Sequence, residues 1–334
     1  MNKFLIIFLL AFATCKFDVD KIMLIEYQKF IKKYSKNYKS MDEYLAKFEV
    51  FKKNVFESFS RSNPTFKTGV TKFSDMTQEE FANNYLGLNY ADLNKENFEA
   101  VTITKFGAAP PSFDWRNEGR VSEVKEQGNC KACYAFTTIG NLEGLYYAKT
   151  KVMTPLSEQM IVDCDNVDGG CRGGLMKDTI EWIKSNGGIM AEKDYPYKGK
   201  KGLSCKKKPE KYVDLKVTGY KRLGSTDRIF DCVDENQIKE FLYENGPLIA
   251  AVNGMFLQDY IKGILDYPSD ICSSAYINHG VLIVGYGTEG STNMDYWTVK
   301  NSLGKDWGES GYFRIRRGAG TCGINCYIMT ATIE

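Results

Sequence analysis

Two cysteines three positions apart, Cys130 and Cys133, lie where a helix is predicted to begin, and the chain has a single histidine, His279. A cysteine in the first turn of a helix feels the positive end of the helix dipole, which favours thiolate over thiol. A nearby neutral imidazole can accept the thiol proton, and a side-chain amide such as that of Asn301 can orient the imidazole. These residue types predict Cys133 as a nucleophile, His279 as its acid/base and Asn301 as the orienting group.

Helices are predicted before strands in the part of the chain that carries these residues. Apolar residues at helical spacing predict helices at 132–148 and 176–183. Short runs rich in Val, Ile and aromatic residues predict strands at 280–285, 296–300 and 311–316. His279 immediately precedes the first of these strands, and Asn301 follows the second. This order of elements predicts an α+β domain in two lobes.

The preceding part of the chain, from Phe17 to about Lys105, is rich in Lys, Glu and Phe and lacks cysteine. Apolar residues at three- and four-residue spacing predict an amphipathic helix there, with Phe48, Phe51, Val55 and Phe59 on one face. The sequence Gly107 to Pro111 breaks regular structure and predicts an exposed, cleavable linker. Two units with different tasks are therefore expected.

The N-terminus has the pattern of a secretory signal peptide. Lys3 is followed by an apolar run from Phe4 to Phe12 and then by small residues at 13–15. The run is too short to span a bilayer, and no other stretch is long and apolar enough, so no membrane anchor is expected. A lipoprotein signal ending at Cys15 is the alternative, although the residues before that cysteine fit it poorly.

Composition argues against other classes of partner. The 334 residues are 43% apolar and 26% charged, with a formal net charge of +2. This is ordinary globular composition without a strong field, so neither nucleic acid nor an anionic membrane is an expected partner. The lysines at 206–208 are interpreted as a solvated loop.

The cysteine count constrains the nucleophile. Of ten cysteines, Cys15 leaves with the signal peptide, and an odd number in an oxidising compartment predicts at least one unpaired thiol. A thioredoxin-like site would pair Cys130 with Cys133 and leave His279 without a role. A zinc site at Cys130, Cys133, Cys164 and Cys171 is disfavoured by the oxidising compartment and by the cysteine spacing. We therefore expect no metal and no organic cofactor.

Three segments resemble the active-site motifs of papain-like cysteine peptidases. They are Gln127–Phe136, Asn278–Gly287 and Lys300–Tyr312. Ser112–Arg116 is similar to the usual start of the mature enzyme, and Gly69–Asp75 looks like a propeptide motif of the cathepsin L-like branch. His279 lies 146 residues after Cys133, within the family's spacing, and Asn301 lies 168 after it, slightly beyond that spacing.

The resemblance implies a two-lobed papain-like fold, with a helical lobe and a β-barrel-like lobe, preceded by a mainly helical inhibitory propeptide. The implied divisions are a signal peptide at 1–15, a propeptide at 16–108 and a mature domain at 109–334. The implied activity is that of a cysteine endopeptidase, which cleaves peptide bonds through a thiolate–imidazolium pair and an acyl-enzyme. In this scheme Gln127 and the backbone N–H of Cys133 stabilise the oxyanion beside His279 and Asn301.

The resemblance also implies disulfides and a substrate pocket. The disulfides would be Cys130–Cys171, Cys164–Cys205 and Cys272–Cys322; Cys232 and Cys326 are left over for a fourth, which would leave Cys133 unpaired. The pocket for the side chain two residues before the scissile bond would be lined by Leu175, Met176, Ala251, Ile277, Gly280 and Tyr327. These residues predict a preference for Leu, Val or Phe, in a pocket shortened by Tyr327. Gly173 and Gly174 would leave a bare backbone edge for extended substrate.

The expected partners are protein and peptide substrates, the chain's own propeptide as an intramolecular inhibitor, and cystatin-like inhibitors. The expected location is a lysosome- or vacuole-like compartment, or the exterior after secretion. Acidic pH is expected to loosen the propeptide as carboxylates such as Asp75 become protonated and lose their partners.

Three positions depart from the family pattern. Lys131 stands where glycine is usual, Tyr134 where tryptophan is more frequent, and Leu303 where a tryptophan usually shields the contact between asparagine and histidine. Lys131 and Leu303 motivate the alternative hypothesis, a catalytically weak or inactive papain-like protein that acts in binding or storage.

Overall fold

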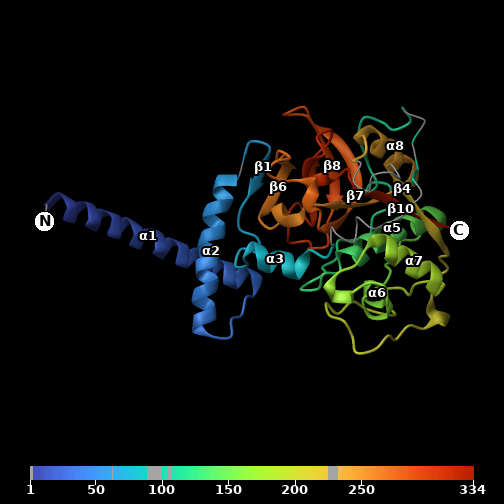
Figure 1. The fold of residues 1–334 in the computed structure, drawn as a ribbon, viewed down its shortest axis with the longest axis horizontal. Helices are drawn as coiled ribbons and strands as arrows, with labels where there is room; N and C mark the ends of the chain where they lie inside the picture. Colours follow the sequence, from blue (N-terminus) through green and yellow to red (C-terminus); the bar gives the residue numbers. More distant parts are fainter. Residues whose placement is uncertain (1–2, 62, 89–99, 102, 104–106, 225–231) are drawn as a thin grey trace.

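The computed structural model describes residues 3–61, 63–88, 100–101, 103, 107–224 and 232–334, with residues 3–18 described as backbone only. Figure 1 shows a helical arm, formed by the first part of the chain, beside a larger body of helices and strands. The helices are α1 (Lys3–Tyr34), α2 (Met41–Arg61), α3 (Gln78–Tyr85), α5 (Cys133–Thr150), α6 (Glu158–Cys164), α7 (Met176–Asn186) and α8 (Glu235–Asn245). The strands are β1 (Phe66–Thr68), β2 (Ala100–Val101), β3 (Phe113–Asp114), β4 (Val217–Leu223), β5 (Leu248–Val252), β6 (Tyr260–Leu265), β7 (His279–Glu289), β8 (Met294–Lys300), β9 (Tyr312–Arg316) and β10 (Ile328–Ile333).

In the arm, α1 and α2 pack through a small aromatic core. Its buried members are Met23, Tyr27, Phe30, Phe48, Phe51 and Val55. The predicted amphipathic helix is confirmed as α2, but its predicted face was wrong at Phe59, which is 72% exposed. Ser58, 1% exposed, is buried in this turn instead. The last turn of α2 packs against β1 rather than α1, since the Thr68 hydroxyl donates to the Ser58 carbonyl.

The predicted signal peptide begins at residues 1 and 2, which lie outside the described residues. The rest of it forms the start of α1. Within the part of the chain that the structure describes, no helix has the length and apolarity needed to cross a membrane.

The segment after α2 docks the arm onto the body. β1 pairs antiparallel with β6, and Phe66 lies opposite Gly263. Farther on, the Gln258 side-chain amide donates to the Phe73 carbonyl at 3.1 Å. A capping box then starts α3, because Thr77 accepts from the Glu80 backbone while the Glu80 side chain accepts from the Thr77 backbone. These contacts position α3 against the body (Figure 1).

The body has two apolar cores. One surrounds α5 and α7, and the other lies among the strands around Trp297, Trp307 and Phe313. The strands form one sheet in the order β1-β6-β9-β8-β7-β5-β10-β4-β2, and β3 pairs with β7. The β6–β9 and β2–β4 pairs are parallel and the others antiparallel. The prediction of an α+β fold in two lobes is confirmed.

Most predicted elements of the body are present with shifted ends. The predicted helices correspond to α5 and α7, and the predicted strands to β7, β8 and β9. α7 ends where Gly187 adopts a left-handed conformation with φ of 78°. Helices α6 and α8 were not predicted. α6 has only 7 residues, too few turns for a strong periodic signal. α8 is as long as α7, and its apolar residues at helical spacing, Ile238, Phe241 and Leu242, were a usable signal that was missed.

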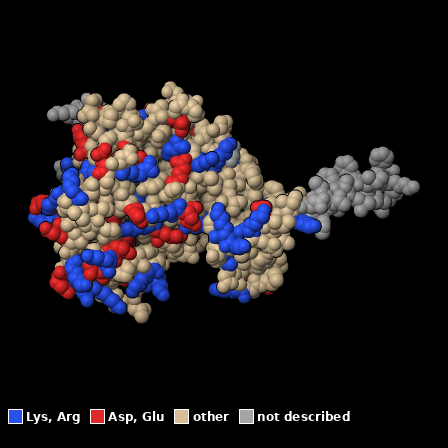
Figure 2. Space-filling model, turned by 180° about the vertical axis from the view of Figure 1, so that it is seen from behind, with Lys and Arg blue, Asp and Glu red and all other residues tan. Residues whose placement is uncertain are grey.

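The predicted linker is exposed at Gly107 and Ala108, but it is also anchored. The backbone N–H groups of Gly107, Ala108 and Ala109 all donate to the carboxylate of Glu240 on α8, at 3.0–3.1 Å. The preceding residues 104–106 lie outside the described residues. On the face seen in Figure 2, acidic and basic side chains are interspersed over the body.

A glycine in β6 provides a test of how the arm docks. Gly263 has φ of 95°, and a Cβ there would lie 2.4 Å from the Thr65 carbonyl oxygen of the arm. We expect Gly263→Ala to separate β1 from β6 and to speed amide hydrogen exchange of residues 66–68 by about tenfold or more, since such strain costs roughly 1–3 kcal/mol.

Gly318 is the matched control, because it has a similar φ of 89° and no atom within 4 Å of an added Cβ. Equal rates of amide hydrogen exchange in β1 for Gly318→Ala and Gly263→Ala would show that the contact at Gly263 does not hold β1 on β6.

Candidate active site

Cys133 is the first residue of α5, whose N-cap, Ala132, makes no side-chain capping bond. The first-turn N–H groups are therefore available to the sulfur, and those of Tyr134 and Cys133 act to lower the pKa of the Cys133 thiol. The N–H groups of Gly280 and Gly87 also donate to the sulfur. Complete burial nevertheless dominates and raises the pKa of the Cys133 thiol. In this state Cys133 is held as a neutral thiol.

His279 begins β7 and Asn301 directly follows β8, and the antiparallel pairing of these strands brings the two residues together. His279 Nε2 lies 2.8 Å from Asn301 Oδ1. An amide oxygen can only accept, so the ring proton is assigned to Nε2 and Nδ1 is left as an acceptor. Burial lowers the pKa of His279 to about 4, against the opposing effect of the Asn301 hydrogen bond. The imidazole is therefore neutral.

The contact between His279 and Asn301 is buried, since the two residues are 0% and 5% exposed. The backbone N–H of Ser302 donates to Asn301 Oδ1 at 2.9 Å and fixes the amide. Leu303 and Trp307 are each 1% exposed, and both belong to the core of the strand lobe. With a leucine at position 303, the side chains of His279 and Asn301 thus remain buried and hydrogen-bonded.

Gln127 lies on the loop before α5, with its side chain fully buried. Its Nε2 donates to the Tyr85 carbonyl at 2.9 Å and to the Cys130 carbonyl at 2.8 Å. Its Oε1 accepts from the Ser302 hydroxyl at 2.6 Å. Ser302 was not singled out from the sequence, although its place directly after Asn301 in the motif was a usable signal.

The segment Tyr85–Leu88 of the arm runs across this site. The Gly174 N–H donates to the Gly87 carbonyl at 3.2 Å, so the bare edge predicted at Gly173 and Gly174 is paired with the arm. The Leu88 N–H donates to the Asn278 carbonyl at 3.0 Å. Only glycine fits at position 87, because an added Cβ would lie 2.2 Å from the Lys131 carbonyl oxygen. Sequence reasoning missed this segment, whose only signal is a glycine between two leucines.

The residues predicted to line an apolar pocket are all buried. Leu175, Met176, Ala251, Ile277 and Tyr327 belong to one core, and a Cβ on Gly280 would lie 3.3 Å from the Met176 sulfur. Leu88 belongs to the same core. Leu88 of the arm therefore packs in the same apolar core as the residues that were predicted to bind an apolar side chain of the substrate.

Eight cysteines are paired in the structure. The bridges are Cys130–Cys171, Cys164–Cys205, Cys232–Cys326 and Cys272–Cys322. Among the residues whose side chains are described, Cys133 is the one free cysteine. No cluster of three or more His, Cys, Asp or Glu suited to a metal ion occurs among them.

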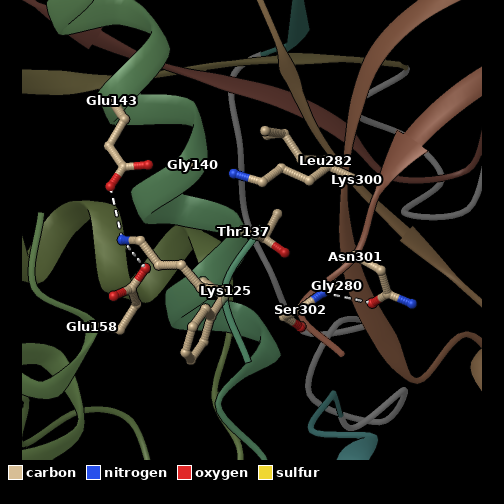
Figure 3. A pocket seen from close by; sticks show the side chains of 11 residues that line it. Lys125, Thr137, Gly140, Glu143, Glu158, Gly280, Leu282, Lys300, Asn301 and Ser302 are labelled. Carbon is tan, nitrogen blue, oxygen red and sulfur yellow. Dashed lines mark hydrogen bonds and ion pairs between the residues drawn. The ribbon is translucent and has the colours of Figure 1, made fainter. Parts of the chain in front are cut away.

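A buried cluster of charges lies behind the site, between the two lobes (Figure 3). Lys125 donates to Glu143 at 2.9 Å and to Glu158 at 2.7 Å. Lys300, the residue before Asn301, donates to the Ser122 hydroxyl at 2.9 Å, and Ser122 donates to Glu143. Burial raises the pKa of Glu158 to about 7 and lowers the pKa of Lys300 to about 8.

Comparison with known proteins identifies both parts of the chain. Residues 109–332 match the family model described as papain family cysteine protease, and residues 27–81 match the cathepsin propeptide inhibitor domain (I29). The chain belongs to the papain family of cysteine proteases. It is therefore an enzyme that hydrolyses peptide bonds and is made as a precursor, in which the arm is the inhibitory propeptide.

Relatives span both the propeptide and the protease. The "Probable cysteine protease RD19D" of Arabidopsis thaliana is 40% identical, with 92% of this chain and 86% of the relative covered. A "Cysteine proteinase" of Trypanosoma brucei brucei is 39% identical, with 97% and 72% covered. Among solved structures, the digestive procathepsin L 3 of Tenebrio molitor larval midgut has a TM-score of 0.79 at 32% identity, with 93% of this chain and 99% of that chain covered. A recombinant stem bromelain precursor has a TM-score of 0.81 at 33% identity, with the same coverage.

The charge cluster predicts a pH dependence of stability. The pKa of Glu158 is about 7 in the folded chain and about 4.3 in an unfolded one, so the protonated form stabilises the fold. That contribution is complete below about pH 4 and lost as the pH rises through about 7. In a Cys133→Ala background that blocks self-cleavage, Glu158→Gln should remove part of the fall in unfolding free energy between about pH 5 and 7, by about 1–3 kcal/mol.

Chemical denaturation at several pH values measures this effect. Glu210→Gln, at an exposed glutamate, is the control. Parallel pH profiles for Glu158→Gln and Glu210→Gln would contradict the assignment to Glu158.

Proposed function

We propose that Cys133 is the nucleophile of this protease and His279 its acid/base. Asn301 orients the imidazole, and Gln127 donates to the oxyanion. One observation carries the assignment: Asn301 holds Nε2 of His279 at 2.8 Å and leaves Nδ1 as an acceptor, while the N–H of the next residue, Gly280, donates to the Cys133 sulfur. This arrangement supports proton transfer from the thiol to Nδ1 once the site is open.

The proposed reaction proceeds through an acyl-enzyme. The Cys133 thiolate attacks the scissile carbonyl carbon, and the oxyanion forms against Gln127 Nε2 and the Cys133 N–H. The imidazolium of His279 gives its proton to the leaving amine as the C–N bond breaks, which leaves a thioester. His279 then takes a proton from water as the water attacks the thioester, and Cys133 is released with the carboxylic acid.

The propeptide is proposed to silence the site in two ways. Backbone groups of Tyr85, Gly87 and Leu88 use the hydrogen-bonding groups that substrate would need, on Gln127, Gly174 and Asn278. Burial under the propeptide also favours the neutral forms of Cys133 and His279, since a charged pair loses its hydration there.

The proposed divisions of the chain are a signal peptide at 1–15, a propeptide at 16–108 and a mature enzyme at 109–334. The family matches at 27–81 and 109–332 are compatible with them. The exposed backbone at Gly107 and Ala108 supports cleavage in the linker. The Glu240 carboxylate would hold the new N-terminus, because it already accepts from the N–H of Ala109, the first residue of the proposed mature enzyme.

The proposed substrates carry an apolar side chain two residues before the scissile bond. Leu88 of the propeptide, which packs with Leu175, Met176 and Tyr327, supports this preference. Leu, Val and Phe fit the same apolar surroundings. Extended substrate would pair with Gly174, as Gly87 does now.

The proposed location is the secretory pathway, ending in a lysosome- or vacuole-like compartment or outside the cell. Four disulfides suit an oxidising compartment. The stabilising protonation of Glu158 suits an acidic one. Cystatin-like inhibitors are proposed as partners because they would block the same cleft that Tyr85–Leu88 occupies.

Peptide hydrolysis by acid-processed protein tests these roles. The Cys133→Ala variant is processed by added wild-type enzyme and then separated from it. It should not hydrolyse a peptide that carries Leu two residues before the scissile bond. Gln127→Ala should lower kcat about 10²–10³-fold, as expected for loss of one oxyanion donor. Equal rates for wild type and Cys133→Ala would instead support the binding or storage alternative.

Release of the propeptide should depend on Glu80. Although burial opposes it, hydrogen bonds from Lys47 and Thr77 hold the pKa of Glu80 below its usual value. The stability it provides is present above the unfolded pKa of about 4.3 and is lost as the pH falls through the folded value. We expect Glu80→Gln to process itself faster than wild type at about pH 5, where the wild-type carboxylate is still charged, because glutamine keeps the capping box but not the ion pair.

Time courses on gels measure the processing. Glu79→Gln removes the same charge from the neighbouring exposed position and serves as the control. Indistinguishable processing of Glu80→Gln and Glu79→Gln would refute this role.

A further inference from the structure

The groove beside Cys133 carries an unbalanced charge. It has a volume of about 640 Å³, and its lining includes Gly87 and Leu88 of the propeptide together with Lys131, Arg172 and Asn278. Of all the residues that line the groove, Lys131 and Arg172 are cationic, and none is Asp or Glu. In the described part of the chain, neither Lys131 nor Arg172 forms an ion pair. Lys125 in the buried charge cluster, by contrast, has two acidic partners, Glu143 and Glu158.

One disulfide holds both cations at the groove. Lys131 follows Cys130 and Arg172 follows Cys171, and these cysteines are bonded with their Cα atoms 4.5 Å apart. The Lys131 N–H also donates to the Cys171 carbonyl at 3.4 Å. The two side chains therefore project from adjoining backbone on the same wall, two residues before the nucleophile and one residue before Gly173.

The propeptide shows how close this wall is to the reacting atoms. Gly87 donates its N–H to the Cys133 sulfur, and a Cβ on Gly87 would lie 3.1 Å from the Lys131 Cβ. On its other side, a Cβ on Gly173 would lie 2.3 Å from the Gly87 carbonyl oxygen. A residue bound over Cys133 thus has Lys131 and the Arg172–Gly173 backbone as its neighbours. The propeptide presents glycine there, and among the residues that the structure describes neither cation has an acidic partner.

Alternation along an extended substrate decides which side chain faces the cations. Successive side chains of an extended chain point to opposite sides. Once the side chain two residues before the scissile bond enters the apolar core of Leu175 and Met176, the next side chain points away from that core. The next residue is the one whose carbonyl Cys133 attacks, so its side chain enters the open groove.

We propose that Lys131 and Arg172 form a subsite for an acidic side chain, so that the enzyme prefers Glu or Asp at the residue whose carbonyl is attacked. The proposal rests on the proposed function and adds a specificity to it. Lys131 would act by charge complementarity with substrate, not by changing the nucleophile. Ion pairs with both cations in this partly exposed groove should together give a preference of about tenfold for Glu over Gln.

Three fluorogenic peptides that differ only at the attacked residue, Glu, Gln or Lys, test the proposal with processed enzyme. Wild type should give a kcat/KM for Glu about tenfold above that for Gln, with Lys lowest. The Glu/Gln ratio should fall in about 0.5 M NaCl, which screens exposed charges, and on acidification towards about pH 4, where glutamate becomes protonated. If Lys131 had only a structural role, the Glu/Gln ratio would depend on neither salt concentration nor pH.

Variants localise the effect. Lys131→Gly should lower the Glu/Gln ratio, since only Arg172 then remains, Lys131→Arg should retain it, and Lys131→Glu should reverse the order of Glu and Lys peptides. Lys151→Gly is the control, because Lys151 is exposed at the opposite end of α5 with φ of 59°, which glycine tolerates. A Glu/Gln ratio near one in active wild type overturns the subsite and leaves the protease assignment intact. Failure to cleave any of the peptides overturns both.

Discussion

The burial of Cys133 and His279 in the closed site, with Gly87 of the propeptide against Cys133, is the constraint on which the precursor depends. A thiolate and an imidazolium are stable only when water or compensating dipoles surround them. The propeptide backbone at Gly87 takes the place of water beside the sulfur. Burial raises the pKa of Cys133 and lowers that of His279 to about 4, so both groups are neutral in the closed site. The propeptide thereby blocks access to the nucleophile and disfavours its reactive form at the same time.

Gly87 contacts the site through its backbone alone, so its position depends on how the rest of the arm is docked on the body. The docking of β1 on β6 supplies part of that support. Ion pairs on either side supply more: Arg61 contacts Asp259 at 3.0 Å, and Lys72 contacts Asp306 at 3.0 Å. The capping box of α3 then sets the direction in which Tyr85 leaves the helix. Glu80 of that box has a lowered pKa, so the stability it gives to α3 is lost as the pH falls, which links acidity to activation.

Much of this arrangement could be predicted from the sequence. The predicted two-lobed α+β fold, the strands that place His279 beside Asn301, and the amphipathic helix of the arm are all present, since each has a periodic or motif signal. The path of Tyr85–Leu88 was not predicted, because an extended segment held by backbone contacts leaves no pattern of side chains. Phe59 was misplaced for a related reason: spacing defines a helix face, but only the packing of β1 against the last turn decides which side is covered. The Glu143, Glu158 and Lys300 cluster was also missed, since its members come from distant parts of the chain.

The rate of alkylation of Cys133 by iodoacetamide as a function of pH, in intact precursor and in processed enzyme, tests the central claim most directly. A small neutral reagent reports the thiolate fraction as well as access to the sulfur. The precursor should react slowly, with a rate that rises only at alkaline pH, and the processed enzyme should react rapidly already at about pH 6. Superimposable pH profiles before and after processing would contradict the claim that the propeptide keeps the Cys133–His279 pair neutral.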